Sequence, residues 1–563
     1  MIDSHKIIVL KFGHSILKSE ADIPQVIAET YLYLRQQHKI LVVVSALGNT
    51  TNELALHIKN IFPDGINDAP VESLANLLGS GEIISSNLVT IGFNQAGLQA
   101  FNLNHEVIKT SGDILDAVPI SLDTDKINNL FNIYDVLVLP GFIGVNENKQ
   151  TTLLGRGGSD FSAIFAASGL VADSCILYKD SNGIVEDINL PLEEQRIYAQ
   201  ISYNHCLKIS SQVIQHKALE YARDHSLMLI IKNIYSQNQT IINAIEEFAF
   251  NPVKKIKKEK IVLLGLGTVG LGVFYKLLKN NRFFEIVGIG VKNLDKHQHH
   301  GIDNKILSND VNEILSRDYD ILIELTGGIQ AKDFILNALQ NKKHVVTANK
   351  LVIAEFFNEL HAIAIKNGVS LKYSAAVAGV VPVLETITNL RKKNVTITAI
   401  SGILNGTSNF ILSNVDKGFL LEDAIKIAQD KGYAESDPTL DINGMDALHK
   451  IKIISFLAFS QKPDKILVEG LEQLENLPEN KDMATKLIAT SKIINGSLIV
   501  KIQLQQLDKK SILASITGAN NCVIIKTNDN KELILQGRGA GRWPTAVAVY
   551  ADILDLSLGI NYA

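Results

Sequence analysis

Residues 260–274, KIVLLGLGTVGLGVF, constrain the fold more than any other part of the chain. They begin with an apolar run typical of a parallel strand buried on both faces and end in the pattern of an amphipathic helix. Between the two, Gly265 permits a sharp turn, Gly267 lets the backbone approach a ligand closely, and Gly270 lets the helix pack against the strand. The segment therefore predicts a strand, a glycine turn and a helix whose free N-terminal amides can hold a phosphate.

Glycine spacing alone is weak evidence, because many such matches are ordinary turns. The following segments strengthen it, since strand patterns at residues 285–291, 320–325 and 344–347 alternate with helical patterns. This alternation is typical of a doubly wound parallel sheet. We therefore expect a Rossmann dinucleotide-binding domain over residues 260–372. Its expected dinucleotide contacts are Gly265, Gly267, Thr268, Val269 and Gly270.

Polar residues follow two of these predicted strands. Thr326 and Gly327 come after one strand, and Lys350 follows the other within the run VVTANK. Because ligands bind at the carboxyl ends of parallel strands, we expect all three beside the dinucleotide. A lysine there can donate a hydrogen bond or carry a proton, whereas a lysine that only snorkels along the surface is the alternative.

The end of the strand predicted at residues 285–291 bears on coenzyme choice. A ribose-binding carboxylate would stand about 20 residues past the glycines, but Lys292 and Asn293 stand there. A cation suits a 2′-phosphate, so NADP(H) is expected to be preferred, with NAD(H) as the alternative.

Residues 432–450, GYAESDPTLDINGMDALHK, bring several carboxylates close to a lysine. Asp446 and Lys450 are four positions apart, so they share one face of a helix. An ordinary helical ion pair explains this spacing, and a catalytic lysine held by carboxylates is the sharper alternative.

Composition excludes several classes of protein. With 563 residues, 46% of them hydrophobic and 20% charged, the chain should fold into three or more globular α/β domains. A net charge of −5 gives no electrostatic reason to expect nucleic acid. Three scattered cysteines favour a reducing, cytoplasmic location over a disulfide framework. No signal peptide or membrane span is expected, because no apolar run approaches the ~18 residues needed.

Residues 1–250 are predicted to form an α/β domain of their own. Strand patterns occur at residues 7–11, 40–44, 136–140, 174–178 and 227–231, with helical patterns at 23–37 and 159–168. Residues 251–259 are predicted to be a linker, because they are rich in lysine and include a proline. A nucleic-acid patch is the alternative there, although the aromatic residues of such patches are missing. Residues 373–536 are expected to form a further α/β region, and residues 537–563 to return to the dinucleotide domain.

The strongest motif of this first domain is residues 140–160, PGFIGVNENKQTTLLGRGGSD. Arg156, Ser159 and Asp160 open a predicted helix together with two glycines, which places a guanidinium, a hydroxyl and backbone amides at one anion-binding end. A helix cap explains Ser159 and Asp160 but does not require Arg156. Lys11, beside a glycine at the end of the first strand, can also hold a phosphate.

The second half of the chain resembles homoserine dehydrogenases. The matching segments are GLGTVG, ELTGG, HVVTANK, GILNGTSNFIL at residues 402–412, the block at residues 432–450, and GRGAGRWPTA at residues 537–546. The resemblance implies NAD(P)-dependent interconversion of aspartate 4-semialdehyde and homoserine, in a homodimer or larger homo-oligomer built through the substrate region. It implies acid–base roles for Lys350 and Lys450, with Asp446 orienting Lys450. It also implies that Glu435 and Asp441 bind the amino end of the substrate, with Thr407 and Tyr433 beside them.

Two departures concern the monovalent cation site of that family. Ser374 stands where an acidic residue is common, and Val380 replaces a glycine. The cation site is therefore in doubt. His297, His299 and His300 invite a metal site, but no Cys or carboxylate stands at ligand spacing, so a solvated loop is expected.

The first half resembles the catalytic domain of aspartate kinase, a member of the amino acid kinase family. The matching segments are VVSALGNTTNEL, LLGSGE and GFIG…TTLLGRGGSDFSA. The resemblance implies phosphoryl transfer from ATP, with Mg²⁺, to the β-carboxylate of aspartate, with Lys11 stabilising the transferred group. It implies that Lys179 and Asp180 lie near the nucleotide. The implied aspartate-binding residues are Ser45, Thr51, Glu82, Arg156, Ser159 and Asp160.

Four positions depart from the kinase pattern. His14 stands at a glycine position, Ile16 replaces a serine, His205 replaces a glutamate, and Gln212 stands where a nucleotide-binding lysine is expected. A dehydrogenase with an inactive kinase-like module for ligand binding or assembly is therefore the alternative, and a pair of nucleotide sensors is a third possibility. The short linker leaves no room for ACT-type regulatory domains, so no threonine or lysine feedback through such domains is expected.

Overall fold

The structure, a computed structural model, describes residues 6–61, 70–187, 189–190, 195–209, 213–234, 238–251, 258–281, 283–476, 480, 482–539 and 541–558, without the side chains of residues 298–300, 476, 542 and 558. The chain divides into two compact units, Met1–Ile256 and Lys257–Ala563. Within the described helices, none combines the length and apolar character needed to cross a membrane.

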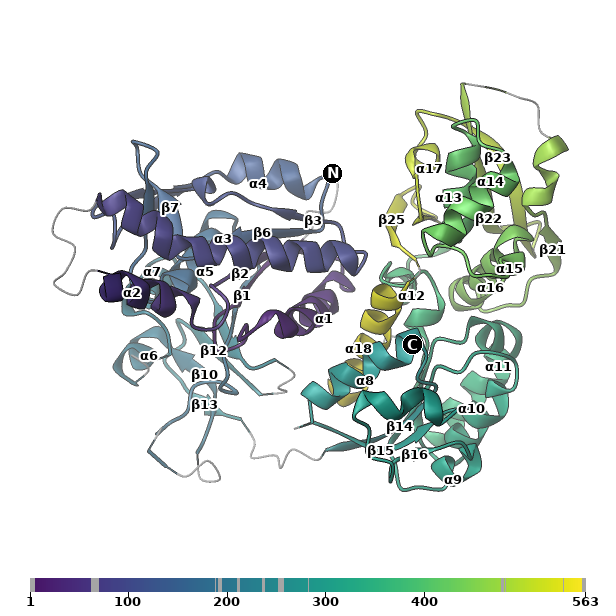
Figure 1. Cartoon of the computed structure of the whole chain (residues 1–563), viewed down its shortest axis with the longest axis horizontal. Helices are drawn as coiled ribbons and strands as arrows, with labels where there is room; N and C mark the ends of the chain where they lie inside the picture. Colours follow the sequence, from purple (N-terminus) through teal and green to yellow (C-terminus); the bar gives the residue numbers. More distant parts are fainter. Residues whose placement is uncertain are drawn as a thin grey trace. The chain divides into compact units, whose positions relative to one another are not determined.

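A nine-stranded sheet forms the centre of the first unit (Figure 1). Its strands are, in spatial order, β13 (Ala249–Phe250), β10 (Tyr198–Ser202), β12 (Gln239–Asn243), β11 (Leu229–Lys232), β9 (Ser174–Tyr178), β1 (Ile7–Phe12), β2 (Lys39–Val44), β6 (Val136–Pro140) and β3 (Ala100–Asn102). The central strands β9, β1, β2 and β6 pair in parallel and are almost wholly buried, as continuous apolar runs require. Their polar carboxyl ends therefore meet at one edge.

Helices cover both faces of this sheet. α1 (Ile23–Leu34) and α3 (Val71–Gln95) pack together on one face, and α5 (Gly158–Gly169) and α7 (His216–Asp224) on the other. The predicted helix at residues 23–37 ends earlier, at Leu34. The remaining helices are α2 (Thr50–Ile61), α4 (Thr124–Phe131) and α6 (Tyr203–Ile209). A small second sheet contains β5 (Val118–Leu122), β4 (Ile108–Ser111), β7 (Ile143–Val145) and β8 (Thr151–Leu153).

The second unit begins with a fully parallel six-stranded sheet. Its strands are β16 (Leu307–Ser308), β15 (Phe284–Gly290), β14 (Glu259–Leu264), β17 (Ile321–Glu324), β18 (His344–Thr347) and β19 (Leu371–Lys372). In chain order this is 3-2-1-4-5-6, the order of a Rossmann sheet, so the predicted fold class is confirmed. Its helices are α8 (Thr268–Lys279), α9 (Val311–Leu315), α10 (Ala331–Gln340), α11 (Lys350–Asn367) and the chain's last helix, α18 (Arg542–Leu558). α18 packs against α8, where Asn280 donates to the Tyr550 hydroxyl at 2.7 Å.

A mainly antiparallel six-stranded sheet forms the rest of this unit (Figure 1). Its strands are β21 (Lys465–Val468), β23 (Ser497–Asp508), β22 (Met483–Ile494), β20 (Ile397–Ile403), β24 (Asn520–Thr527) and β25 (Glu532–Arg538). The accompanying helices are α12 (Val383–Lys392), α13 (Gly406–Val415), α14 (Leu421–Asp430), α15 (Thr439–Ile442), α16 (Met445–Phe459) and α17 (Ile512–Ser515).

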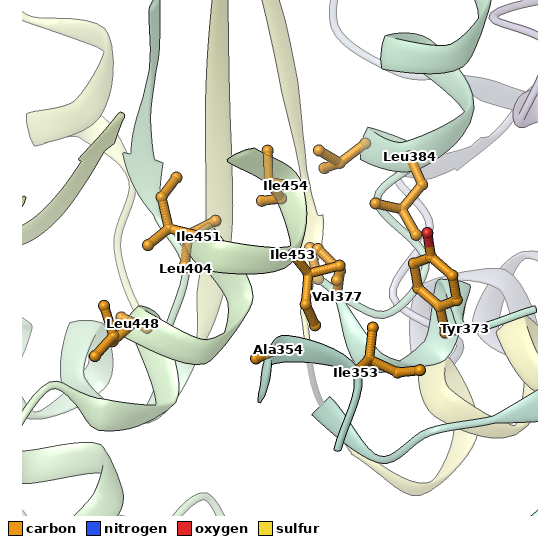
Figure 2. Packing of buried hydrophobic residues seen from close by; sticks show 14 of the residues in the cluster. Ile353, Ala354, Tyr373, Val377, Leu384, Leu404, Leu448, Ile451, Ile453 and Ile454 are labelled. Carbon is orange, nitrogen blue, oxygen red and sulfur yellow. The ribbon is translucent and has the colours of Figure 1, made fainter. Parts of the chain in front are cut away.

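One apolar core joins α11 of the Rossmann part to α16 of the antiparallel part. Ile353 and Ala354 of α11, and Leu448 and Ile453 of α16, are buried in it (Figure 2). The first turns of the two helices meet, because Lys350 of α11 contacts Asp446 of α16. This packing brings together residues about 100 positions apart in the sequence.

Candidate functional site

Lys350 and Lys450 converge on one carboxylate. Lys350 is the first residue of α11, and Asp446 and Lys450 share one face of α16, as their spacing predicted. Asp446 Oδ1 forms an ion pair with the Nζ of Lys350, and Asp446 Oδ2 lies 2.7 Å from the Nζ of Lys450. Lys450 also donates to the Leu404 carbonyl at 2.9 Å. The two ammonium groups that the sequence singled out therefore lie side by side.

The two lysines are made electrostatically unequal by their surroundings. Burial lowers the pKa of Lys450, and the positive charge of Lys350 lowers it further, although Asp446 opposes both effects. Burial also acts to lower the pKa of Lys350, but the charge and hydrogen bond of Asp446 outweigh burial and raise it. Lys350 is 39% exposed and Lys450 is 7% exposed. The buried Lys450 is thus the more acidic ammonium group, and Lys350 is the more accessible one.

Asn405 connects the lysine-binding carboxylate to a second acid, and the sequence analysis did not single it out. Its side-chain amide donates to Asp441 at 2.6 Å and to Asp446 at 2.8 Å. Its oxygen caps α13 by accepting from the Ser408 amide. An Asn directly before a helix was the available sequence signal. Burial raises the pKa of Asp441, and the negative charge of Asp446 adds to this rise.

The other predicted substrate residues surround this group. Thr407 donates to the Tyr433 carbonyl at 2.7 Å, and the Tyr433 ring packs on Phe410. Glu435 is exposed, and its negative charge is among the causes that raise the pKa of Lys350. An acidic rim therefore lies beside the accessible ammonium group.

A fully buried carboxylate that sequence reasoning missed holds the loops at the adjacent sheet edge. Glu324, the last residue of β17, accepts from the Thr326 amide and hydroxyl at 2.8 and 2.6 Å and from the Thr347 hydroxyl at 2.6 Å. Asn349 then donates to the Gly328 carbonyl at 2.8 Å. An acidic residue ending an otherwise apolar strand was the available signal. Glu324 thus links the Thr326–Gly327 turn to the strand that leads to Lys350.

The glycine turn after β14 fits a dinucleotide. Gly265 has φ +94°, and a Cβ on Gly270 would stand 2.1 Å from the Gly265 carbonyl oxygen. A Cβ on Gly267, by contrast, would meet nothing within 4 Å, so the backbone there faces open space. Thr268 and Val269 begin α8 directly after it, and their end of the helix is a ready anion site. Lys292 is exposed just beyond β15.

Ser374, where an acidic residue was expected, lies between two buried carboxylates. Its hydroxyl oxygen is 2.7 Å from Asp552 Oδ1 and 3.1 Å from Glu385 Oε1. A third carboxylate at position 374 would add like charge to this cluster, which gives a physical reason for the serine. Val380 is buried nearby in the chain.

His297, His299 and His300 fall in a 3₁₀ helix, Asp295–His300, and not in the loop that we expected. Among the residues that the structure describes, no group of three or more His, Cys, Asp or Glu could hold a metal ion. Cys175, Cys206 and Cys522 are all buried.

The first unit has its own buried ionic group at the carboxyl edge of the sheet. Asp160 stands in the first turn of α5. Its Oδ1 lies 2.7 Å from the Nζ of Lys11, and its Oδ2 lies 2.7 Å from the Nζ of Lys179. Asp160 is 5% exposed, Lys11 is 6% exposed and Lys179 is 16% exposed. Burial acts to raise the pKa of Asp160, but the two lysines outweigh burial and hold it at about 2. Two cations on one carboxylate leave a net positive charge, which suits an anionic ligand.

Two other predicted kinase residues, Ser45 and Ser159, lie at the same edge. Gly13 lies against the Lys11 ammonium group, with the Ser45 hydroxyl near it. Ser159 is buried beside Asp160 and packs close to Gly141. Arg156 and Asp180 are exposed and Thr51 is half-buried. Among the described residues, none of those three side chains forms a hydrogen bond or ion pair with the Lys11–Asp160–Lys179 group.

Glu82 of α3 is a buried carboxylate beside the end of β2. Its Oε1 accepts from the Ala46 amide at 3.1 Å. Burial raises the pKa of Glu82 to about 7, although the Ala46 amide and Lys11 oppose this rise. A buried carboxylate of this kind is ready to receive a cationic group of a ligand.

The departures from the kinase pattern have different structural surroundings. His14 is exposed, and its pKa is lowered by partial burial and then by the charges of Lys11 and Lys179, so the imidazole is neutral at neutral pH. Ile16 is buried. His205 packs against the Tyr198 and Phe248 rings. Gln212 lies outside the described residues.

Three family models match the chain. The amino acid kinase family matches residues 6–233, the homoserine dehydrogenase NAD-binding domain matches residues 265–374, and homoserine dehydrogenase matches residues 382–554.

Curated relatives agree with the dehydrogenase models. The homoserine dehydrogenase of Neisseria gonorrhoeae is 36% identical over 318 residues, which span 54% of this chain and 73% of the relative. That of Bacillus subtilis is 35% identical over 54% of this chain and 75% of its own length. That of Methanocaldococcus jannaschii is 33% identical over 53% of this chain and 98% of its own length. A solved homoserine dehydrogenase from Thiobacillus denitrificans is 35% identical over 54% of this chain and 73% of that one, with a TM-score of 0.49.

Two kinds of observation now agree. The second unit has a Rossmann sheet with a glycine turn that fits a dinucleotide, and two of its lysines meet on one carboxylate. Homoserine dehydrogenases over 30% identical are covered by this chain for more than two thirds of their length. The chain belongs to the homoserine dehydrogenase family and carries an amino acid kinase family domain ahead of its dehydrogenase part.

Proposed function

We propose that Lys350 and Lys450 form the acid–base centre that interconverts aspartate 4-semialdehyde and homoserine. The observation that carries this proposal is the convergence of both ammonium groups on the buried Asp446. Bound NAD(P)H supplies the hydride in this chemistry. When the aldehyde is reduced, negative charge develops on its oxygen, and an adjacent ammonium group stabilises that charge and donates the proton.

The remaining residues bind and orient the substrate. Glu435 and Asp441 offer carboxylates to the substrate ammonium group, and Asn405 holds Asp441 and Asp446 in one arrangement. Asp446 keeps Lys450 in its deeper position, while the more exposed Lys350 lies toward the dinucleotide edge with Thr326 and Gly327. The proposed dinucleotide domain covers residues 260–372 and 537–563, the substrate domain residues 373–536, and the linker residues 251–259. Assembly into a homodimer or larger homo-oligomer through the substrate domain is also proposed.

Lys292 is proposed to select NADP(H) by binding the 2′-phosphate. Replacing Lys292 with aspartate should lower the ratio of kcat/KM for NADP⁺ over NAD⁺ by about 30-fold, because a charge-assisted contact to phosphate is lost and a repulsive carboxylate appears. Steady-state homoserine oxidation with each coenzyme measures the ratio. Lys296→Asp, in the same exposed segment, is the matched control and should leave the ratio unchanged. Equal efficiency of the unmodified protein with both coenzymes would contradict the assignment.

For the first unit we propose aspartate kinase activity with ATP and Mg²⁺. The supporting observation is the net positive Lys11–Asp160–Lys179 group at the sheet edge that also holds Ser45, Ser159 and Glu82. Lys11 and Lys179 stabilise the transferred phosphoryl group, and Asp160 positions both lysines. Arg156, Thr51 and the other predicted residues bind aspartate, and Asp180 lies near the nucleotide. An inactive module remains the second candidate, because His14 places a neutral ring where a glycine was expected.

Glu82→Gln tests the aspartate site in two separate ways. The raised pKa of Glu82 means that the unfolded chain loses this proton from about pH 4.5, whereas the folded chain keeps it until about pH 7. The free energy of unfolding of the unmodified chain therefore falls as pH rises through this window. Glu82→Gln removes the titrating group, so it should raise the free energy of unfolding at pH 8 by at most about 3 kcal/mol. At pH 4 the variant should be as stable as the unmodified chain. Thermal unfolding at the two pH values measures this effect.

The same variant also reports on ligand binding. ATP-dependent formation of aspartyl hydroxamate should rise as Glu82 ionises near pH 7, and Glu82→Gln should increase KM for aspartate and remove that rise. A stability change without any hydroxamate formation by the unmodified protein would favour the inactive module.

A further inference from the structure

The carbonyl of Leu404 is the point where Lys450 meets the backbone. Leu404 stands between the end of β20 and Asn405, and its side chain is buried in the apolar core that also contains Ile451 (Figure 2). Its carbonyl oxygen accepts from Lys450 Nζ at 2.9 Å. The next residue, Asn405, donates to Asp446, which is the other partner of Lys450. The Leu404–Asn405 step therefore contacts both members of the Lys450–Asp446 pair.

A second donor reaches the same carbonyl oxygen. Asn521, in β24 of the antiparallel sheet, donates from Nδ2 to the Leu404 carbonyl at 3.1 Å, and its side chain is wholly buried. A carbonyl oxygen has two lone pairs, so Lys450 and Asn521 together use its full accepting capacity. The carbonyl is thus held from two sides, by an ammonium group from α16 and by an amide from the sheet.

Two glycines leave room for this amide. A Cβ on Gly539 would stand 1.8 Å from Asn521 Nδ2, and a Cβ on Gly406 would stand 3.3 Å from Asn521 Oδ1. A larger residue at position 539 would displace the amide, because Asn521 is enclosed in a closely packed interior. The surroundings are therefore shaped around the Asn521 side chain.

The hydrogen bonding of Asn521 differs from that of an asparagine that only supports the fold. Asn409, which is also buried, donates to three backbone carbonyls and accepts from Lys486 Nζ at 3.0 Å. Among the residues that the structure describes, the Asn521 side chain has one hydrogen-bond partner, the Leu404 carbonyl, and its Oδ1 accepts from none. A buried acceptor without a donor lowers stability. Stability alone therefore does not account for Asn521, whereas its position lets it act on Lys450.

We propose that Asn521 is a positioning residue for Lys450, which it places through the shared Leu404 carbonyl. This inference rests on the acid–base role proposed above for Lys450. Loss of the amide frees the Leu404–Asn405 step to rotate, and Lys450 then loses a fixed position. Misplacing a catalytic group by about 1 Å can lower a rate by about 100-fold.

Asn521 also acts on the charge of Lys450. Its N–H bond directs a positive end at the oxygen that Lys450 uses, so it disfavours the charged ammonium form. The other charged groups that face Lys450 are Asp446 on its own helix, Lys350 of α11 and Asp441 of α15, and replacing Asn521 alters none of them. Removing the amide should therefore raise the pKa of Lys450.

Asn521→Leu in the full chain tests both effects, because leucine has the same branched shape and no hydrogen-bonding group. At the pH optimum, kcat for homoserine oxidation should fall about 10-fold, while KM for homoserine and for NADP⁺ should change less than about 2-fold. The pH at which aldehyde reduction begins to fall should move up by about 0.5–1 unit, because the raised pKa keeps Lys450 protonated to higher pH. Asn521→Ser, which adds no volume, should show the same shift. Thermal unfolding checks that each variant is folded.

Asn414→Leu is the matched control, since Asn414 is a buried asparagine of α13 whose side chain donates to the Phe410 carbonyl of the same helix. It should leave kcat unchanged within a factor of about 2 and should not move the pH limit. An unchanged kcat for Asn521→Leu, a lower kcat with an unmoved pH limit, or an equal rise in KM would overturn the proposal. Failure of the acid–base role itself would be seen separately, as full activity of Lys450→Met.

Discussion

Replacing Lys450 with methionine is expected to lower kcat for homoserine oxidation by about 10³-fold, because general acid–base catalysis by a positioned side chain contributes in this range. Methionine keeps most of the packing volume of the lysine in α16, so the apolar core formed with α11 should persist. Removing Lys450 leaves Asp446 paired with Lys350, so no carboxylate is left without a cation. The loss should therefore fall on kcat, while NADP⁺ affinity, measured by fluorescence titration, should change little.

Lys452→Met is the matched control for this variant. Lys452 lies on the same helix, two positions further on, and pairs with Glu355 at 2.7 Å instead of Asp446. Its replacement should leave kcat within a factor of about 2, as expected for a pair that includes an exposed partner. The pH dependence of kcat gives a second test. Because the pKa of Lys450 is lowered, the rate of aldehyde reduction should begin to fall at a pH below the ordinary lysine pKa of 10.5. A Lys450→Met enzyme that keeps more than a tenth of kcat would refute the proposed role.

Replacing Asp160 with asparagine is expected to destabilise the first unit by about 3–5 kcal/mol, because removing one partner of a buried ionic group leaves uncompensated charge. Here two ammonium groups, the buried Lys11 and the partly buried Lys179, would lose the same carboxylate. Differential scanning calorimetry with hydrogen exchange of peptides from β1 and α5 would assign the loss to this unit. The dehydrogenase activity of the second unit should be retained.

The pH dependence of this effect has a defined sign. The pKa of Asp160 is about 2 when folded, below the ordinary value of 3.8, so its contribution is present above pH 4 and is lost as pH falls toward 2. The difference between the unmodified chain and Asp160→Asn should shrink in that window. Asp135→Asn, which breaks the ion pair between Lys39 and the exposed Asp135, should cost less than about 1 kcal/mol. Adding Lys179→Met to Asp160→Asn should recover part of the loss, and the absence of any recovery would argue against an electrostatic cause.

Local pattern was enough to locate several strands. β6, β9 and β18 begin and end at the predicted residues, because buried parallel strands are short, continuous apolar runs. Helix ends were less predictable, and α1 stops at Leu34 although its sequence pattern continues to Gln37. Gln37 has a left-handed φ of +66°, which a helix cannot contain.

In the candidate sites, too, some features followed from the local sequence and others depended on the tertiary structure. The sequence alone determined that Asp446 and Lys450 share a face, because four positions are about one helical turn, and that glycines shape the turn after β14. Only the tertiary structure decided that Lys350 meets Asp446, that Asn405 bridges two acids and that Lys179 shares Asp160 with Lys11. Periodicity reports the face that a residue occupies on its own element, whereas contacts between distant elements depend on how their apolar faces pack, as in the core between α11 and α16.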